Sequence, residues 1–194
     1  MEEIKLPKPD MAGSIPLETC IRKRRSVRRY IDEPLTIEQL SQLAWCAQGI
    51  TDEGRGLRAA PSGGATFPAE LYLVTRDGVF NYIPQSHSLN KTADGDQRPG
   101  FSKACLGQGY IAQAALSVVI GMVYTRTLGR YGARGERYIV LEAGHIAQNL
   151  HLQAIALGLD SVAVGAFNDE SVSDVVGLPD DVAPVYIVTI GKAG

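Results

Sequence analysis

Apolar residues recur at every third or fourth position in several stretches, and this spacing predicts helices. One such stretch begins where Thr36 and Gln39 form a capping box, the side-chain pair that opens many helices. The longest stretch is Gly135–Leu157, and Gly158 follows it as a stop signal. The remaining helices are predicted over Pro16–Arg24, Lys103–Ala115 and Asp169–Val176.

Short runs of β-branched and aromatic residues predict strands. Ala69–Thr75 and Val79–Ile83 flank Asp77-Gly78, a dipeptide typical of tight hairpins. Further strands are predicted over Leu116–Val123, Val162–Ala166 and Pro184–Ile190. Helices and strands alternate, yet one connection is a hairpin. The pattern therefore favours an α+β fold with a central mixed sheet and helices around it.

Polar stretches without either spacing predict loops. Thr51–Gly64 is rich in glycine and arginine, and Ser86–Gly100 is polar and carries glycine and proline. Loops of this length in a compact domain are usually functional or mobile. The 194 residues suit a single domain, 1–194, in which Met1–Ser14 forms an N-terminal arm.

Composition and charge exclude several classes of protein. The N-terminus is charged and the longest apolar run, Ala114–Val123, is too short to span a bilayer, so we expect neither secretion nor membrane insertion. The formal charge of −2 argues against a general nucleic-acid binder. Three cysteines without paired spacing suit buried thiols in a reducing cytoplasm, and no metal-ligand spacing is present.

A cluster of cationic side chains lies between Arg22 and Arg29. If the chain is extended after this helix, alternate side chains face one way, so Arg24, Ser26 and Arg28 can converge. Two guanidinium groups and a hydroxyl suit a phosphate or phosphomonoester. A solvated basic patch or a nucleic-acid contact is the alternative interpretation.

Two further stretches suggest contact with a flat ligand, and each is weak alone. In one, two glycines after Pro-Ser allow the backbone to approach a ligand closely, and a serine hydroxyl can donate a hydrogen bond. In the other, small residues after a short strand leave backbone amides exposed. An ordinary loop and ordinary helix–strand packing are the alternatives. The residues concerned are Pro61, Ser62, Gly63 and Gly64 in the first stretch, and Val164, Gly165 and Ala166 in the second.

Two familiar motifs are incomplete. Gly107-x-Gly109-x-x-Ala112 matches the dinucleotide-binding fingerprint, but no strand precedes it and no acidic residue follows at the required distance. Glu142-x-x-His145 is half of a di-iron motif whose second copy is absent. We therefore expect neither to be a site.

Taken together and in this order, the stretches resemble the FMN-dependent nitroreductase family over about Pro16–Lys192. Arg24–Tyr30 resembles the phosphate-binding start of that family, and Pro61–Pro68 resembles its flavin loop. Glu142–Leu150 is similar to its long dimer-forming helix. Gly158–Phe167 is similar to the strand whose backbone meets the flavin ring.

Some positions resemble one branch of the family. Many members carry Asn and Gln where this chain has Ala65 and Phe67. The stretch around Ala65 and Phe67 is more similar to the SagB-type branch, which includes azoline dehydrogenases of peptide maturation. Arg130–Tyr138 also resembles that branch. The basic residue that many nitroreductases place after the last strand corresponds to Lys192.

The resemblance implies a mostly antiparallel sheet and an intertwined homodimer with two FMN sites, each built from both chains. It implies an FMN-dependent oxidoreductase in which NADH or NADPH passes hydride to the flavin. An acceptor such as a nitroaromatic or a quinone then takes the same place, in ping-pong order. The implied cofactor-binding residues are Arg24, Arg25, Ser26, Arg28, Pro61, Ser62, Gly63, Gly64, Val164, Gly165, Ala166 and Lys192. The expected substrate-pocket residues are Phe67, Tyr131, Arg134 and Tyr138.

Other interpretations stay open at this point. Packing at the dimer surface is the alternative role for the tyrosines and arginine of the expected pocket, and no catalytic residue is assigned. One alternative function is a flavin-dependent dehydrogenase that oxidises a peptide azoline or a similar ring. Another is a non-enzymatic flavin-binding storage or sensor protein. A nucleic-acid module would rest only on Arg22–Arg29, and salt-dependent retention on DNA would support it.

Overall fold

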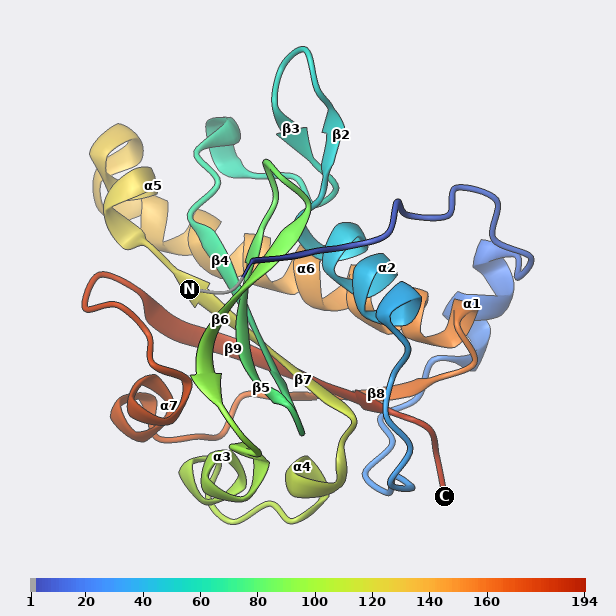
Figure 1. Ribbon diagram of the computed structural model, residues 1–194. Coiled ribbons are helices and arrows are strands. Elements are labelled where there is room, and N and C mark those ends of the chain that lie inside the picture. The colour runs from blue at the N-terminus through green and yellow to red at the C-terminus, as the bar shows by residue number, and fades with distance from the viewer. Residues whose placement is uncertain (1–2) are drawn as a thin grey trace.

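The computed structural model describes residues 3–194, and Figure 1 shows one sheet with helices on both faces. The strand order of the large sheet is β1-β6-β5-β4-β7-β9-β8, and β2 and β3 form a separate hairpin. The strands are β1 (Glu3–Lys5), β2 (Ile50–Asp52), β3 (Leu57–Arg58), β4 (Ala69–Thr75), β5 (Gly78–Ile83), β6 (Ser88–Asp94), β7 (Leu116–Met122), β8 (Asp160–Val164) and β9 (Ala183–Gly191). The helices are α1 (Leu17–Lys23), α2 (Ile37–Gln48), α3 (Arg98–Ala104), α4 (Tyr110–Gln113), α5 (Tyr124–Tyr131), α6 (Gly135–Ala156) and α7 (Asp169–Val176).

The large sheet is mixed but mostly antiparallel, which confirms the predicted fold class. Within residues 3–194, every pair of neighbouring strands in it runs antiparallel. The parallel contribution is an isolated bridge between Ser26 and Ser161, which attaches the segment after α1 to β8. This bridge joins two of the stretches that the sequence singles out.

The two faces of the sheet carry separate hydrophobic cores. In β4, Leu71 and Leu73 belong to the core beneath α2 and α6, whereas Tyr72 and Val74 belong to the core beneath α3 and α7. This division follows from the period of two in a strand, which sends successive side chains to opposite faces. The central strand β7 is buried along its whole length, in agreement with its apolar sequence.

The best-capped helix has the start that the sequence predicts. The Gln39 amide donates to Thr36 Oγ1 at 3.2 Å, and the Thr36 amide donates to Gln39 Oε1 at 2.9 Å. The capping box therefore satisfies two backbone donors that α2 itself leaves free. Strands β4, β5, β7, β8 and β9 and helices α1, α6 and α7 also lie within two or three residues of their predicted ranges.

Three predictions of local structure are wrong. Ser86–Gly100 is not a loop, because it contains β6 and the start of α3. Strand β6 is mostly polar and only its first two residues, Ser88 and Leu89, are buried, so no apolar alternation marks it in the sequence. Thr51–Gly64 contains most of the β2–β3 hairpin. Lys103–Ala115 is not one helix, because Leu106 and Gly107 have φ values of +58° and +72° and separate α3 from α4. The sequence prediction also missed α5.

The N-terminal arm packs on its own chain as far as it is described. Met1 and Glu2 lie outside the described residues, and Glu3–Lys5 forms β1 against β6. Further along, Ser41 Oγ donates to the Pro7 carbonyl, and the Asp10 amide donates to Gln42 Oε1 at 2.8 Å. Contacts with α2 therefore hold this part of the arm. None of the helices in residues 3–194 combines the length and the apolar character that a membrane crossing requires.

Candidate functional site

The segment after α1 runs beside β8. Ser26 and Ser161 form the parallel bridge, and the Val27 amide donates to the Ser161 carbonyl at 3.1 Å. Tyr30 anchors the far end of the segment, because its hydroxyl lies 3.1 Å from Thr189 Oγ1 in β9. The segment is therefore extended, which is the condition for Arg24, Ser26 and Arg28 to face one way, and both ends of it are attached to the sheet.

The cations of this segment differ in their partners. Arg25 Nη1 donates to the carbonyls of Arg22 at 3.1 Å and Arg24 at 2.7 Å, so its guanidinium satisfies the C-terminal end of α1. The side chains of Arg24, Ser26 and Arg28 have no hydrogen-bond or ion-pair partner in the part of the chain that the structure describes. Two guanidiniums and a hydroxyl are therefore free to bind an anion.

A buried histidine supports this segment from beneath. His151 Nδ1 lies 2.7 Å from Ser161 Oγ, in the residue that bridges to Ser26. Burial lowers the pKa of His151 to about 4, and the nearby Arg24 lowers it further, so the imidazole is neutral at pH 7. Sequence reasoning missed His151, because its partner Ser161 lies ten residues away and meets it only through the turn after α6.

The exit of β8 presents unused backbone donors. The β8–β9 ladder ends at Val164 opposite Ile187. Within residues 3–194, the amides of Gly165 and Ala166 donate no hydrogen bond, and both residues are exposed. Gln108 Nε2 holds the Ala166 carbonyl at 2.9 Å. Gly165 lies four positions after Ser161, so these amides lie about 13 Å along the strand from the bridge.

The loop that contains Pro61–Gly64 is packed against α5 and α6. A short 3₁₀ turn, Gly63–Ala65, follows Ser62, whose Oγ accepts the Phe67 amide at 2.9 Å. A Cβ on Gly63 would lie 3.2 Å from the Cβ of Tyr138. Gly64 has φ +61°, and a Cβ there would collide with the Tyr131 hydroxyl. Within the chain, the glycines therefore allow this loop to approach two tyrosines.

Both expected pocket tyrosines lie at this loop. The rings of Tyr131 and Tyr138 meet edge to face with their centroids 5.0 Å apart. Arg130 Nη1 donates to the Gly64 carbonyl at 2.8 Å, a contact that the sequence did not indicate. Arg134 is exposed and lies with Val140 and Leu141 beside a shallow surface hollow. Among the described residues, Arg134 makes no hydrogen bond or ion pair with the loop.

A buried polar cluster lies behind the same loop. Glu142 is 2% exposed, and burial raises the pKa of its carboxyl, a shift that Ser62 and Arg58 oppose. Arg58 Nη1 donates to Gln48 Oε1 at 2.8 Å, and its guanidinium lies 4.8 Å from the Phe67 ring centroid. These residues come from α2, β3 and α6, so no sequence spacing could have indicated the cluster.

The predicted site residues do not all meet within one chain. Ser62–Gly64 lies against Tyr138, whereas Ser26 lies against the strand that His151 supports. The loop contacts α6 from Tyr138 to His145, whose Nδ1 lies 3.4 Å from the Pro61 carbonyl. These contacts lie about 9 to 20 Å along the helix before His151. Figure 1 shows α1 near one end of α6, and the loop before β4 near the other. Lys192 Nζ pairs with Glu33 at 2.8 Å.

The free groups along β8 fit FMN, the cofactor that the sequence resemblance implies. A phosphate dianion requires cations and hydroxyl donors, and Arg24, Ser26 and Arg28 offer them unpaired. A flavin ring requires donors near its polar edge, and the amides of Gly165 and Ala166 are unused. For metals, the described residues include no group of three or more His, Cys, Asp or Glu side chains placed to hold an ion.

Comparison with known proteins identifies the family. The nitroreductase family model matches residues 21–192. A nitroreductase homologue from Methanocaldococcus jannaschii is 40% identical over 196 residues, covering 98% of this chain and 96% of that protein. A solved nitroreductase homologue from Ralstonia eutropha has 30% identity and a TM-score of 0.90, covering 99% of this chain and 90% of that one. The microcin B17-processing protein McbC from Escherichia coli is 25% identical over 169 residues, 81% of this chain and 62% of that protein. The chain belongs to the nitroreductase family.

Proposed function

We propose that the protein is an FMN-dependent oxidoreductase that takes hydride from NADH or NADPH and passes electrons to an acceptor such as a nitroaromatic or a quinone. The observation that carries the proposal is the arrangement along β8. Unpaired cations lie at one end of the strand and unused amides lie at the other. This arrangement matches a ligand with an anionic end and a flat polar end.

The chain's own residues bind and orient the cofactor. FMN, when bound, supplies the hydride and electron chemistry. Arg24, Ser26 and Arg28 hold the phosphate, and the amides of Gly165 and Ala166 donate to the ring edge. The backbone at both ends is fixed before the ligand arrives, because Ser26 is bridged to β8 and Gln108 holds the Ala166 carbonyl. No side chain is assigned as a catalytic acid or base.

We further propose that each site uses two copies of the chain. Ser62–Gly64 contacts α6 at Tyr138 and Glu142, about 13 to 20 Å along the helix before His151, so one chain presents the two halves apart. Between these ends, α6 exposes Val140 and Leu141 at 58% and 54%. A second copy packed across this face would bring its loop to the cations of the first and would bury these apolar side chains. The active form is then a homodimer.

The first experiment is an anaerobic visible spectrum of the purified protein, before and after addition of NADH or NADPH. We expect flavin bands that bleach on addition. Bands that persist would contradict the reductase and favour either the dehydrogenase or a storage protein. No flavin after incubation with FMN would overturn the cofactor and its site residues together.

Subunit complementation tests the two-chain site. Arg24→Gln damages the cation half, and Gly64→Trp damages the loop half by colliding with Tyr131. Randomly exchanged dimers of the two variants contain one intact site per heterodimer, so about a quarter of all sites recover. The measurement is FMN bound per chain after unfolding and refolding the mixture. No recovery would place both halves of the site in one chain.

A second candidate function is a flavin-dependent dehydrogenase that oxidises a peptide azoline or a similar ring. The similarity to McbC favours it, together with the Arg130–Tyr131 pair, which lies directly against the flavin loop. The test is incubation of the FMN-loaded protein with a thiazoline-containing peptide and oxygen. A mass loss of two hydrogens in the peptide would support the dehydrogenase.

A further inference from the structure

A cavity separate from the proposed flavin site lies on another part of the molecule. It has a volume of about 290 Å³ and opens between the segment before α2, the β4–β5 turn and strands β5 and β6. Its size is close to the lower limit for small-molecule pockets. Its apolar lining includes Ile4, Leu35, Leu40, Phe80, Leu89 and Ala115.

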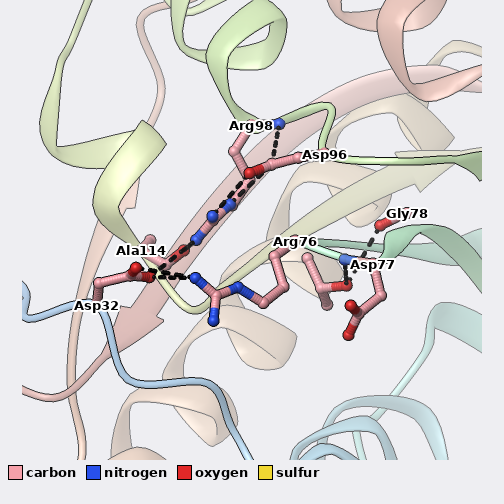
Figure 2. Close-up of polar contacts among 8 residues, drawn as sticks. Asp32, Arg76, Asp77, Gly78, Asp96, Arg98 and Ala114 are labelled. Atoms are coloured by element: carbon pink, nitrogen blue, oxygen red, sulfur yellow. Dashed lines mark hydrogen bonds and ion pairs between the residues drawn. The ribbon is translucent and has the colours of Figure 1, made fainter.

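A buried arginine is fixed at the edge of this cavity. The Arg98 side chain is 10% exposed, and its Nε and Nη2 atoms donate to the two carboxylate oxygens of Asp96 at 2.9 and 2.7 Å. Its Nη1 atom donates to the Ala114 carbonyl at 3.2 Å. Figure 2 shows these contacts, which hold the guanidinium with Nη1 turned toward Asp32. The bidentate geometry leaves the cation little freedom to move.

A second arginine and one exposed carboxylate complete the edge. Arg76 Nη2 donates to both carboxylate oxygens of Asp32 at 2.8 Å, and Asp32 Oδ1 lies 3.9 Å from Arg98 Nη1. The Asp32 carboxylate therefore lies between two guanidiniums (Figure 2), although its side chain is 70% exposed. Exposed ion pairs contribute little to stability, so another carboxylate can replace Asp32 at small cost.

We propose that this cavity binds a small apolar monocarboxylate, whose carboxylate takes the place of Asp32 between Arg76 and Arg98 while its tail lies on the apolar lining. Asp77 and Glu33 also border the cavity and repel a second negative charge, whereas Lys91, the other cation of the lining, is paired with Asp94. A carboxylate therefore suits the site better than a phosphate dianion. The proposal is independent of the flavin chemistry, because it uses none of the residues assigned to that site.

The test is a calorimetric titration of octanoate into the protein as purified. We expect one saturable site, weakened at least tenfold in Arg76→Gln. In Asp32→Asn the affinity rises several-fold, because the competing carboxylate is gone. Each methylene removed from the probe weakens binding about threefold to fourfold. Arg55→Gln is the matched control, because Arg55 is an exposed arginine paired with Asp52 elsewhere, and it leaves binding unchanged.

Three results would overturn the proposal. The first is the absence of saturable binding in both the wild type and Asp32→Asn. The second is equal affinity in the wild type and Arg76→Gln, which would place octanoate elsewhere. The third is tighter binding of octylammonium than of octanoate, which would assign the site to a cation facing Asp77. Leu35→Trp fills the cavity without touching the arginines, and its expected loss of binding checks the apolar part independently.

Discussion

The two ends of α6 carry two differently built halves of the proposed flavin site. Near His151, Arg24 and Arg28 have no partner among the described residues, and the amides at the exit of β8 are unused. Near Tyr138, the Ser62–Gly64 loop is packed against two tyrosines and a buried carboxyl. The first half offers unpaired cations and unused amide donors, and the second offers a loop that side-chain packing holds in one conformation. We infer that the first half supplies affinity and the second supplies position.

The contrast has a physical reason. Arg28 is exposed and Arg24 is half-buried, so both cations keep contact with water, and leaving them unpaired costs the fold little until an anion arrives. A loop that contacts a flat ligand has to be held in one conformation, and side-chain packing does this without charge. The edge of the separate cavity differs from both, because there Asp32 already occupies the position between two arginines.

The largest expected effect comes from replacing the two unpaired arginines. Arg24→Gln with Arg28→Gln should weaken FMN binding about 1,000-fold, since each charge-assisted hydrogen bond contributes roughly 1.5–3 kcal/mol. The measurement is quenching of flavin fluorescence during titration. Arg22→Gln with Arg29→Gln makes the same change in net charge and should shift affinity less than tenfold. Equal losses in the two double variants would reduce the cluster to a general electrostatic patch.

The next effect concerns the support beneath the cations. The pKa of His151 is about 4 in the folded protein and about 6.5 when unfolded, so the unfolded chain binds more protons between these values. The stability contributed by the neutral imidazole is complete above pH 6.5 and is lost as pH falls toward 4, by about 3 kcal/mol at most. Urea unfolding from pH 4 to pH 7.5 should show a shallower pH dependence for His151→Asn than for the wild type. Parallel curves would contradict the burial argument.

A smaller effect concerns the packed half. Gly64→Ala places a side chain at φ +61° and against the Tyr131 hydroxyl, so it should destabilise the fold by about 1–2 kcal/mol. Gly129 is the matched control, because it lies in α5 with open space around it. Gly129→Ala should be neutral or stabilising by up to about 1 kcal/mol. Thermal unfolding of both variants tests this. Similar changes in unfolding temperature would contradict a special conformational requirement at Gly64.

The smallest effect concerns Lys192. Its ammonium is paired with Glu33, and both side chains are 51% exposed. Lys192→Met should change stability by less than about 0.5 kcal/mol and FMN affinity by less than threefold, since exposed pairs contribute little. A tenfold loss of FMN affinity would show instead that the lysine leaves Glu33 for the phosphate, as the resemblance implies.

Elements that begin, turn or continue with a clear local sequence signal were predicted correctly. The capping box at Thr36, the hairpin at Asp77-Gly78 and the apolar run of β7 each depend on a few neighbouring residues, and each prediction is confirmed. Where the signal was mixed, the prediction failed. Strand β6 is mostly polar, and the break between α3 and α4 includes Leu106, a leucine with a positive φ that its residue type does not indicate.

By itself, the sequence determined the fold class, the cluster of cations between Arg22 and Arg29 and the order of the candidate stretches, because these follow from spacing and residue type. Only the tertiary structure decided which charges stay unpaired, since Arg25 and Lys192 have partners that the sequence did not indicate. It also decided the buried contacts of His151 and Glu142 and the cavity edged by Arg98. Those features join residues from separate elements. A side chain's burial and partners depend on which elements pack together, and no local pattern encodes that.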